Sequence, residues 1–277
     1  RLTQQLASLT EQPKGKPPSI PLTAWHHHTT ADHYAAGVQR IRDLIAAGDL
    51  FQANLTACCS TAWPQGGNAL ELFVTLREAC PAPFAGLIIS DQNEALLSSS
   101  PERFLQVSAE GAVQTRPIKG TRPRHGDPEQ DANLAAELVC SDKDRAENVM
   151  IVDLLRNDLG RACQPGSIQV PQLVGLESYA SVHHLTSVVE GQLQTGLSWV
   201  DLLEASWPGG SISGAPKLRA CQRLHELEPT SRGPYCGSLL RIDWDGSFDS
   251  NILIRSLLRQ GDTLRAHAGC GIVADSD

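Results

Sequence analysis

Two carboxylates, Asp144 and Glu147, stand three residues apart in a segment with helical periodicity. This spacing places both side chains on one face of a helix. Hard oxygen ligands suit Mg²⁺, which commonly takes one or two protein carboxylates and completes its shell with water and substrate. We expect Glu137 and Asp153 near the same face. The spacing alone favours an ordinary solvated acidic face, so a metal site needs further support.

Lys119 lies in a strongly basic segment, Arg-Pro-Ile-Lys-Gly-Thr-Arg-Pro-Arg, residues 116–124. An amine attacks only when it is neutral, and an ordinary lysine is almost entirely protonated at neutral pH. We expect Arg116, Arg122 and Arg124 to supply part of the positive field that favours the neutral amine. Gly120 permits close backbone approach. A basic surface loop is the alternative interpretation.

Residues 209–217 read Gly-Gly-Ser-Ile-Ser-Gly-Ala-Pro-Lys. Gly209 and Gly214 have the separation found in phosphate-binding P-loops, but Ala215 stands where that motif needs lysine. The mismatch excludes this nucleotide-binding motif. A Gly- and Ser-rich turn that leads into a helix can still receive a carboxylate through its backbone N–H groups. An ordinary helix cap remains the alternative.

Length and composition exclude several classes of protein. The 277 residues fit one large domain or two small ones, and 41% are hydrophobic, which excludes a disordered chain. The net charge of −8 argues against nucleic acid or an anionic membrane as the main partner. No apolar run is long enough to span a membrane, and no secretory signal is present. The eight cysteines lack a C-x-x-C pair, which indicates reduced, mostly buried thiols in a cytoplasmic protein.

The expected elements begin after a polar, Pro-bearing segment, residues 1–31, which reads as a linker or the remnant of a missing region and carries His26–His28 in a surface loop. Asp32 is the expected N-cap of a helix that Gly48 ends, and Asn68 caps a second helix. Further helices are expected near 130–140, 142–156 (opened by Ser141), 198–206 and 215–227. Expected strands lie near 84–89, 94–98, 104–108, 112–116, 168–174, 179–193, 235–243, 250–259 and 262–268. Because the strands come in runs, we expect mostly antiparallel sheets with flanking helices, an α/β (α+β) fold.

Six segments together resemble the chorismate-utilising enzymes, which include anthranilate, aminodeoxychorismate, isochorismate and salicylate synthases. The segments are Gly-Asp-Leu-Phe-Gln-Ala-Asn-Leu-Thr (48–56), Ser-Pro-Glu-Arg-Phe (100–104), Lys-Asp-Arg-Ala-Glu-Asn-Val-Met-Ile-Val-Asp-Leu-Leu-Arg-Asn-Asp-Leu-Gly-Arg (143–161), Pro-Gly-Gly-Ser-Ile-Ser-Gly-Ala-Pro-Lys (208–217), Arg-Gly-Pro-Tyr-Cys-Gly (232–237) and Gly-Cys-Gly-Ile-Val-Ala-Asp-Ser (269–276). The resemblance runs from about Tyr34 to the last residue. It implies a sandwich of large antiparallel β-sheets flanked by helices, a catalytic domain over 32–277, and an active site between the sheets.

The resemblance also implies a role for individual residues. Glu102 would protonate the leaving C4 hydroxyl of chorismate while Lys119 attacks C2, and ammonia would then add at C4 and expel Lys119. His184 would lie beside the ring. Mg²⁺, held by Glu147 with Asp144 close by, would bind the ring carboxylate. The implied substrate-binding residues are Gln52, Gly120, Thr121, Ser211, Tyr235, Arg255, Gly269 and Gly271.

Two positions distinguish the branches of this family. Isochorismate and salicylate synthases carry a lysine base where this chain has Gln52, and anthranilate synthases carry alanine where it has Lys119. Lys119 therefore resembles the signature of component I of aminodeoxychorismate synthase, in the p-aminobenzoate branch of folate synthesis. Anthranilate synthase component I and a non-catalytic chorismate-binding fragment remain the alternatives. Nothing in the sequence resembles a glutaminase, so a separate or fused glutamine amidotransferase is expected to supply ammonia.

The sequence departs from the family pattern in two ways. Cys270 replaces an alanine, a small change expected to alter only packing. The family's second Mg²⁺-binding glutamate would fall beyond Asp277, and members carry a longer N-terminal region. We therefore expect that the fold is truncated at both ends and that the final helix is lacking.

Overall fold

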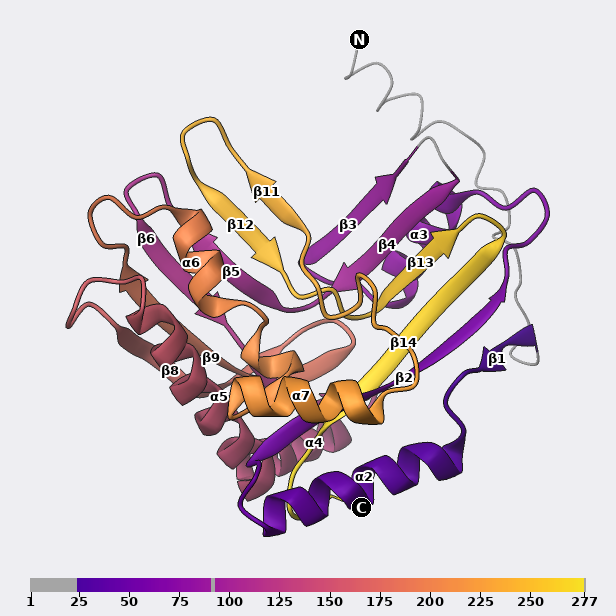
Figure 1. Cartoon of the computed structure of the whole chain (residues 1–277), viewed down its shortest axis with the longest axis horizontal. Helices are drawn as coiled ribbons and strands as arrows, with labels where there is room; N and C mark the ends of the chain where they lie inside the picture. The colour runs from indigo at the N-terminus through magenta and orange to yellow at the C-terminus, as the bar shows by residue number, and fades with distance from the viewer. Residues whose placement is uncertain (1–23, 91–92, 277) are drawn as a thin grey trace.

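The computed structural model describes residues 24–90 and 93–276. It contains two seven-stranded sheets, and every strand pairing in these residues is antiparallel (Figure 1). Helices pack on both sheets, so the expected mixed class with large antiparallel sheets is confirmed. No helix in this part of the chain is long and apolar enough to cross a membrane. Most of the expected N-terminal linker, residues 1–23, lies outside the described residues.

The first sheet is built around a long strand, β2 (Gln52–Ala62), that the sequence pattern did not predict. The strand order is β1 (His26–His27), β2, β14 (Thr263–Ile272), β13 (Ser256–Gln260), β4 (Glu94–Ser100) and β3 (Phe84–Ile89), and β10 (Gly214–Ala215) pairs with β2. The expected histidine loop is wrong in part, because His26 and His27 pair with β2 as a short exposed edge strand.

The second sheet carries the basic segment as a strand, β7 (Ile118–Pro123). The strand order is β11 (Leu240–Ile242), β12 (Phe248–Asn251), β5 (Arg103–Val107), β6 (Ala112–Arg116), β9 (Val182–Gln192) and β7, and β8 (Gln169–Ser178) also pairs with β9. The interpretation of the basic segment as a surface loop is therefore wrong. Its residues pair with β9 from Ile118 to Pro123.

The two sheets are joined by two short crossovers that run next to each other. Pro101 and Glu102 connect β4 to β5, and residues 252–255 connect β12 to β13. The predicted single strand over 250–259 is therefore wrong, because the chain changes sheets within it. The crossovers are hydrogen-bonded: the Ile252 N–H donates to the Glu102 carbonyl (3.1 Å), and the Ser99 N–H donates to the Arg255 carbonyl (3.0 Å). Figure 1 shows the two sheets diverging from this connection.

Helices cover the sheets. On the first sheet lie α2 (Ala31–Ala46), α3 (Ala69–Ala79) and α7 (Lys217–Leu227); on the second lie α4 (Pro128–Cys140), α5 (Asp142–Gly160) and α6 (Trp199–Ser206). Asn68 and Ser141 cap α3 and α5 as expected. The predicted cap at Asp32 is wrong, because Thr30 caps α2 by accepting from the His33 N–H and Asp32 lies in the first turn. A 3₁₀ turn, η2 (Gly210–Ile212), precedes β10.

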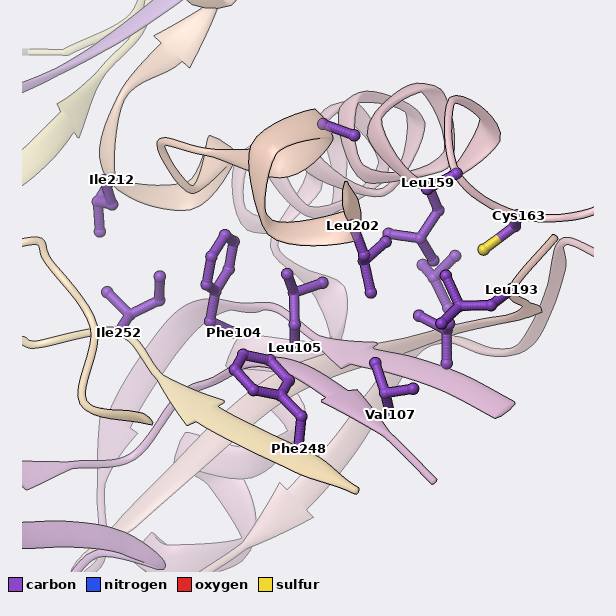
Figure 2. Close-up of a cluster of buried hydrophobic side chains, with 14 of the residues drawn as sticks. Phe104, Leu105, Val107, Leu159, Cys163, Leu193, Leu202, Ile212, Phe248 and Ile252 are labelled. Atoms are coloured by element: carbon purple, nitrogen blue, oxygen red, sulfur yellow. The ribbon is translucent and has the colours of Figure 1, made fainter. Parts of the chain in front are cut away.

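The largest core lies between the second sheet and helices α5 and α6 (Figure 2). Phe104, Leu105 and Phe248 from the strands meet Leu159 and Leu202 from the helices, and each of these five side chains is at most 2% exposed. Burial of this apolar surface fixes α5 against the sheet. All eight cysteines are free thiols, but the expectation that most are buried is wrong: only Cys58, Cys163 and Cys236 are buried, and Cys140 and Cys270 are exposed.

Candidate active site

The Lys119 side chain lies where the two sheets meet. Lys119 precedes a bulge in β7 at which the pairing with β9 shifts register, and Gly120 there has φ +81°. A β-carbon on Gly120 would press against Asp144 and Leu138 at 2.9 Å, so only glycine fits. The Lys119 Nζ donates to the carbonyl of Ser211 (3.2 Å). It also lies 3.5 Å from where a β-carbon on Gly271, in the other sheet, would stand.

The three arginines expected to supply positive charge around Lys119 do not stand as free charges beside it. Each of the three arginines pairs with a carboxylate instead: Arg116 with Glu177, Arg122 with Glu137 and Asp144, and Arg124 with Asp131. The charge of Lys119 acts instead on Glu102 and Glu147, and it lowers the pKa of both carboxyls. The Lys119 amine is therefore flanked by two carboxyl groups.

Glu102 occupies the first crossover and is 5% exposed. Burial raises the pKa of Glu102 to about 7, although a hydrogen bond from the Ser211 side chain, the Lys119 charge and a bond from the Ile118 backbone all lower it. A carboxyl with a pKa near neutrality can hold a proton and release it in the same pH range. Glu102 thus has the properties of a general acid, and it lies beside the candidate nucleophile.

His184, on β9, pairs across the strands with Thr121, whose hydroxyl lies 2.8 Å from the ring Nδ1. Burial, aided by the charge of Arg255, lowers the pKa of His184 to about 4, so the ring is neutral at physiological pH. The ring of Tyr179 lies 5.8 Å from that of His184. Sequence reasoning missed Tyr179, because it stands in a polar turn with no distinctive spacing.

Gln52, Gly269 and Gly271 line the first sheet at the same junction. Gln52 is 1% exposed, and its side-chain Oε1 is buried without a hydrogen-bond partner among the described residues. A β-carbon on Gly271 would overlap the Gln52 amide, and one on Gly269 would overlap the Leu55 carbonyl. An unpartnered buried acceptor is unfavourable unless a ligand donates to it, so Gln52 fits a binding role.

The structure places Arg255 near His184 but places Tyr235 in a separate buried cluster. Arg255 ends the second crossover with φ +50°, an uncommon conformation for a non-glycine residue, and its charge acts on His184. Tyr235 is 9% exposed and stacks on His267 at 5.2 Å. Burial raises the pKa of Tyr235, and its electrostatic neighbours are Cys236 and Arg232. Arg255 therefore lies near His184, whereas the contacts of Tyr235 belong to a separate buried cluster.

Asp144 and Glu147 project from α5 toward β7. Burial raises the pKa of Glu147, and the negative charge of Asp144 raises it further, which indicates that the two carboxylates repel each other. Glu137 reaches this pair through Arg122, as expected, but Asp153 does not: it is 68% exposed and pairs with Arg156. No cluster of three or more metal-binding side chains lies within residues 24–90 and 93–276. Two carboxylates nevertheless fit Mg²⁺, which keeps water and substrate in the rest of its shell.

The glycine-rich segment forms a buried loop around η2 that leads into α7. Pro216 stands at the N-cap of α7 and supplies no side-chain cap. A β-carbon on Gly210 would collide with Leu154, so the loop packs closely on α5. Ser211 is the residue that contacts the site, because its carbonyl binds Lys119 and its side chain binds Glu102.

Sequence comparison places these residues among known relatives. The chain is 46% identical over 255 residues to aminodeoxychorismate synthase component 1 of Klebsiella aerogenes, an alignment that covers 92% of this chain and 56% of the relative. It is 42% identical over 254 residues to anthranilate synthase component 1 of Streptomyces coelicolor, covering 91% of this chain and 49% of the relative. The chain thus spans about half the length of these curated relatives.

Structural comparison agrees. The crystal structure of anthranilate synthase component I from Streptococcus pneumoniae TIGR4 superimposes with a TM-score of 0.86 and 34% identity, covering 100% of this chain and 61% of that chain. The family described as "chorismate binding enzyme" matches residues 1–277. This chain belongs to the chorismate-binding enzyme family.

Proposed function

We propose that this chain is the catalytic part of an aminodeoxychorismate synthase component 1, which converts chorismate and ammonia to 4-amino-4-deoxychorismate. The observation that carries the proposal is the position of Lys119, whose amine lies at the sheet junction against Ser211 and close to Gly271. The 46% identity to the Klebsiella aerogenes enzyme supports the same assignment.

In the proposed reaction, the Lys119 nitrogen bonds to C2 of chorismate as the ring double bonds shift and the C4–O bond breaks. Glu102 gives its proton to the departing hydroxyl, which leaves as water. Its pKa of about 7 supports this role, because the carboxyl is protonated in a useful fraction at neutral pH. Ammonia then bonds to C4, the double bonds shift back, and the C2–N bond to Lys119 breaks.

The other residues at the junction bind and orient the substrate in this proposal. Neutral His184, held by Thr121, would lie against the ring, and Arg255 would pair with a substrate carboxylate. The unpartnered Oε1 of Gln52 is an acceptor for an N–H or O–H donor. Glu147 with Asp144 would hold Mg²⁺, which when bound supplies positive charge to the ring carboxylate.

Ammonia would come from a glutamine amidotransferase, either a separate subunit or a fused domain, because component 1 is the name of one part of a two-part enzyme. We further propose that the reaction takes place in the cytoplasm, a reducing compartment suited to eight free cysteines.

Anthranilate synthase component I is the second candidate, and the 42% identity to the Streptomyces coelicolor relative favours it nearly as well. That reaction places the amine at C2 and releases pyruvate. A chorismate-binding fragment without turnover is the third candidate.

Product analysis distinguishes the three candidates. The full-length protein that carries this chain is purified and incubated with chorismate, Mg²⁺ and ammonium. Products are identified by liquid chromatography with mass spectrometry, and calorimetry measures chorismate binding. We expect 4-amino-4-deoxychorismate. Anthranilate with pyruvate would establish the second candidate, and chorismate binding without any product would establish the third.

A further inference from the structure

A single lysine joins the two ends of the loop that carries Ser211. The loop, residues 207–216, leaves α6 after Ser206 and enters α7 at Lys217. The Lys217 Nζ donates to the Ser206 carbonyl (2.7 Å) and pairs with the Asp158 carboxylate (2.6 Å) on α5. The first residue of α7 therefore binds both the residue before the loop and the helix beneath it.

Most of this ion pair is buried, since Asp158 is 3% exposed and the Lys217 side chain is 17% exposed. Removing two charges from water costs free energy, so a buried pair adds little to stability compared with well-packed apolar side chains. What such a pair does supply is a fixed geometry, because each charge holds its partner at a defined distance. Here the geometry that is fixed is the closure of the loop.

Ser211, near the middle of the loop, contacts both reactive groups of the candidate site. Its carbonyl accepts from the Lys119 Nζ (3.2 Å), and its side chain hydrogen-bonds to the Glu102 carboxyl. The neighbouring Ile212 carbonyl accepts from Arg232 (2.8 Å), and Gly210 packs against Leu154. A displacement of the loop would therefore be transmitted to Lys119 and Glu102 together.

We propose that Lys217 is a positioning residue for the reaction: by closing the loop onto Asp158 and Ser206, it holds Ser211 against Lys119 and Glu102. The proposal rests on the function assigned above for its catalytic consequence, but its structural part stands on the contacts alone. Lys217 does not take part in the chemistry in this scheme.

Release of the loop is expected to raise the pKa of Glu102. The groups that face its carboxyl are the Ser211 side chain, the Lys119 ammonium and the Ile118 backbone N–H, and all three favour the ionised form. If the loop is released, the hydrogen bond between Ser211 and Glu102 is lost. The pKa of Glu102 then rises above its value of about 7, by about one pH unit for one lost bond to a charged group.

The test uses three variants. Lys217→Met removes the amine but leaves Asp158 as an unpaired buried charge. That charge destabilises the fold whether or not the loop positions Ser211. The double variant Asp158→Asn/Lys217→Met removes both charges and is expected to fold while the loop closure is lost. Arg219→Gln, on the same helix, breaks a pair with Asp49 in which the arginine is 40% exposed, and it serves as the matched control.

The pKa of Glu102 is obtained from the pH dependence of thermal unfolding, by comparing each variant with and without Glu102→Gln. We expect the double variant to raise the Glu102 midpoint by about one pH unit and to lower kcat for amination about ten- to a hundredfold, with Arg219→Gln unchanged. A folded double variant with the wild-type midpoint and kcat would overturn the proposal. Absence of amination in the wild type would count against the proposed function only, because the midpoint still reports on Lys217.

Discussion

The Lys119 amine of the second sheet lies 3.5 Å from the position that a β-carbon on Gly271 would take in the first sheet. The same β-carbon would overlap the side-chain amide of Gln52. A methyl group at this position must displace the Gln52 amide and would lie in van der Waals contact with the Lys119 amine. We therefore expect Gly271→Ala to lower kcat/KM for amination at least about tenfold, with a loss of unfolding free energy of about 1–3 kcal/mol from overpacking.

Gly126→Ala is the matched control for this variant, because a β-carbon there meets no atom within 4 Å. Its kcat/KM should equal that of the wild type. Steady-state kinetics and denaturant unfolding measure both quantities. An unimpaired Gly271→Ala enzyme would mean that amination does not depend on the observed position of the Gln52 amide.

Lys119→Ala removes the proposed nucleophile. We expect amination to fall by about three orders of magnitude or more, because the covalent route is closed, while chorismate affinity changes little. Mass spectrometry follows the product and calorimetry follows binding. Lys143→Ala is the control, since Lys143 also lies near Glu147 but is exposed on α5. Wild-type rates in Lys119→Ala would refute the covalent mechanism.

The buried carboxyl of Glu102 predicts a pH dependence of stability. Its pKa in the folded protein, about 7, lies above the ordinary value of 4.5, so the folded state retains the proton over a range in which the unfolded state has lost it. Stability therefore falls as the pH rises from about 4.5 to about 7, by about 3 kcal/mol in total, and stays lower above that range.

Glu102→Gln cannot ionise and should lack this slope, so it should be more stable than the wild type at pH 8 and similar at pH 4.5. The same variant should lose amination activity, because it cannot donate the proton. Thermal unfolding across this pH range is the measurement. If the unfolding midpoints of the two proteins depend on pH in the same way, burial does not raise the pKa of Glu102 in the folded state.

The Asp144–Glu147 pair predicts a magnesium effect that does not depend on turnover. A divalent cation should reduce the repulsion between the two carboxylates. Mg²⁺ at ten times its Kd should therefore raise the unfolding free energy of the wild type by about 1.4 kcal/mol. Glu147→Gln should lose this response, and Asp153→Asn, an exposed acid on the same helix, should keep it. The midpoint of thermal unfolding with and without Mg²⁺ measures the effect. A full response in Glu147→Gln would place the ion elsewhere.

The sequence predicted the locally determined elements well, because their signals are short-range. Asn68 and Ser141 cap helices whose first turns need acceptors, and the strand at Phe84–Ile89 has the predicted bounds. The strand Gln52–Ala62 was missed although polar and apolar residues alternate from Gln52 to Ala57, because the alternation ends at Cys58. The polar members of the alternation, such as Gln52 and Asn54, are buried as well, which a pattern of polar residues does not indicate. The change of sheet within residues 252–255 was also missed, because its apolar residues read as a continuous strand.

The site residues were found from motif resemblance, but their surroundings were not. The arginines near Lys119 in the sequence form ion pairs with carboxylates on other strands and helices. Folding brings Glu102 and Glu147, which are distant in the sequence, close to the Lys119 amine. The role of Ser211 depends in the same way on a contact between a loop and a strand about 90 residues apart.

The pairing of β2 with β14 has a consequence for how the protein acquires its site. The two strands lie about 200 residues apart in the chain, yet they pair over their length from Ala53 with Ile272 to Ala62 with Thr263. Contacts this distant form slowly, because a large loop must close before they stabilise anything. Gln52 and Gly271 can meet only after that closure, so the site assembles at a late stage of folding. During synthesis, a ribosome-bound chain that lacks β14 lacks Gly269 and Gly271, so activity requires that the first sheet is complete.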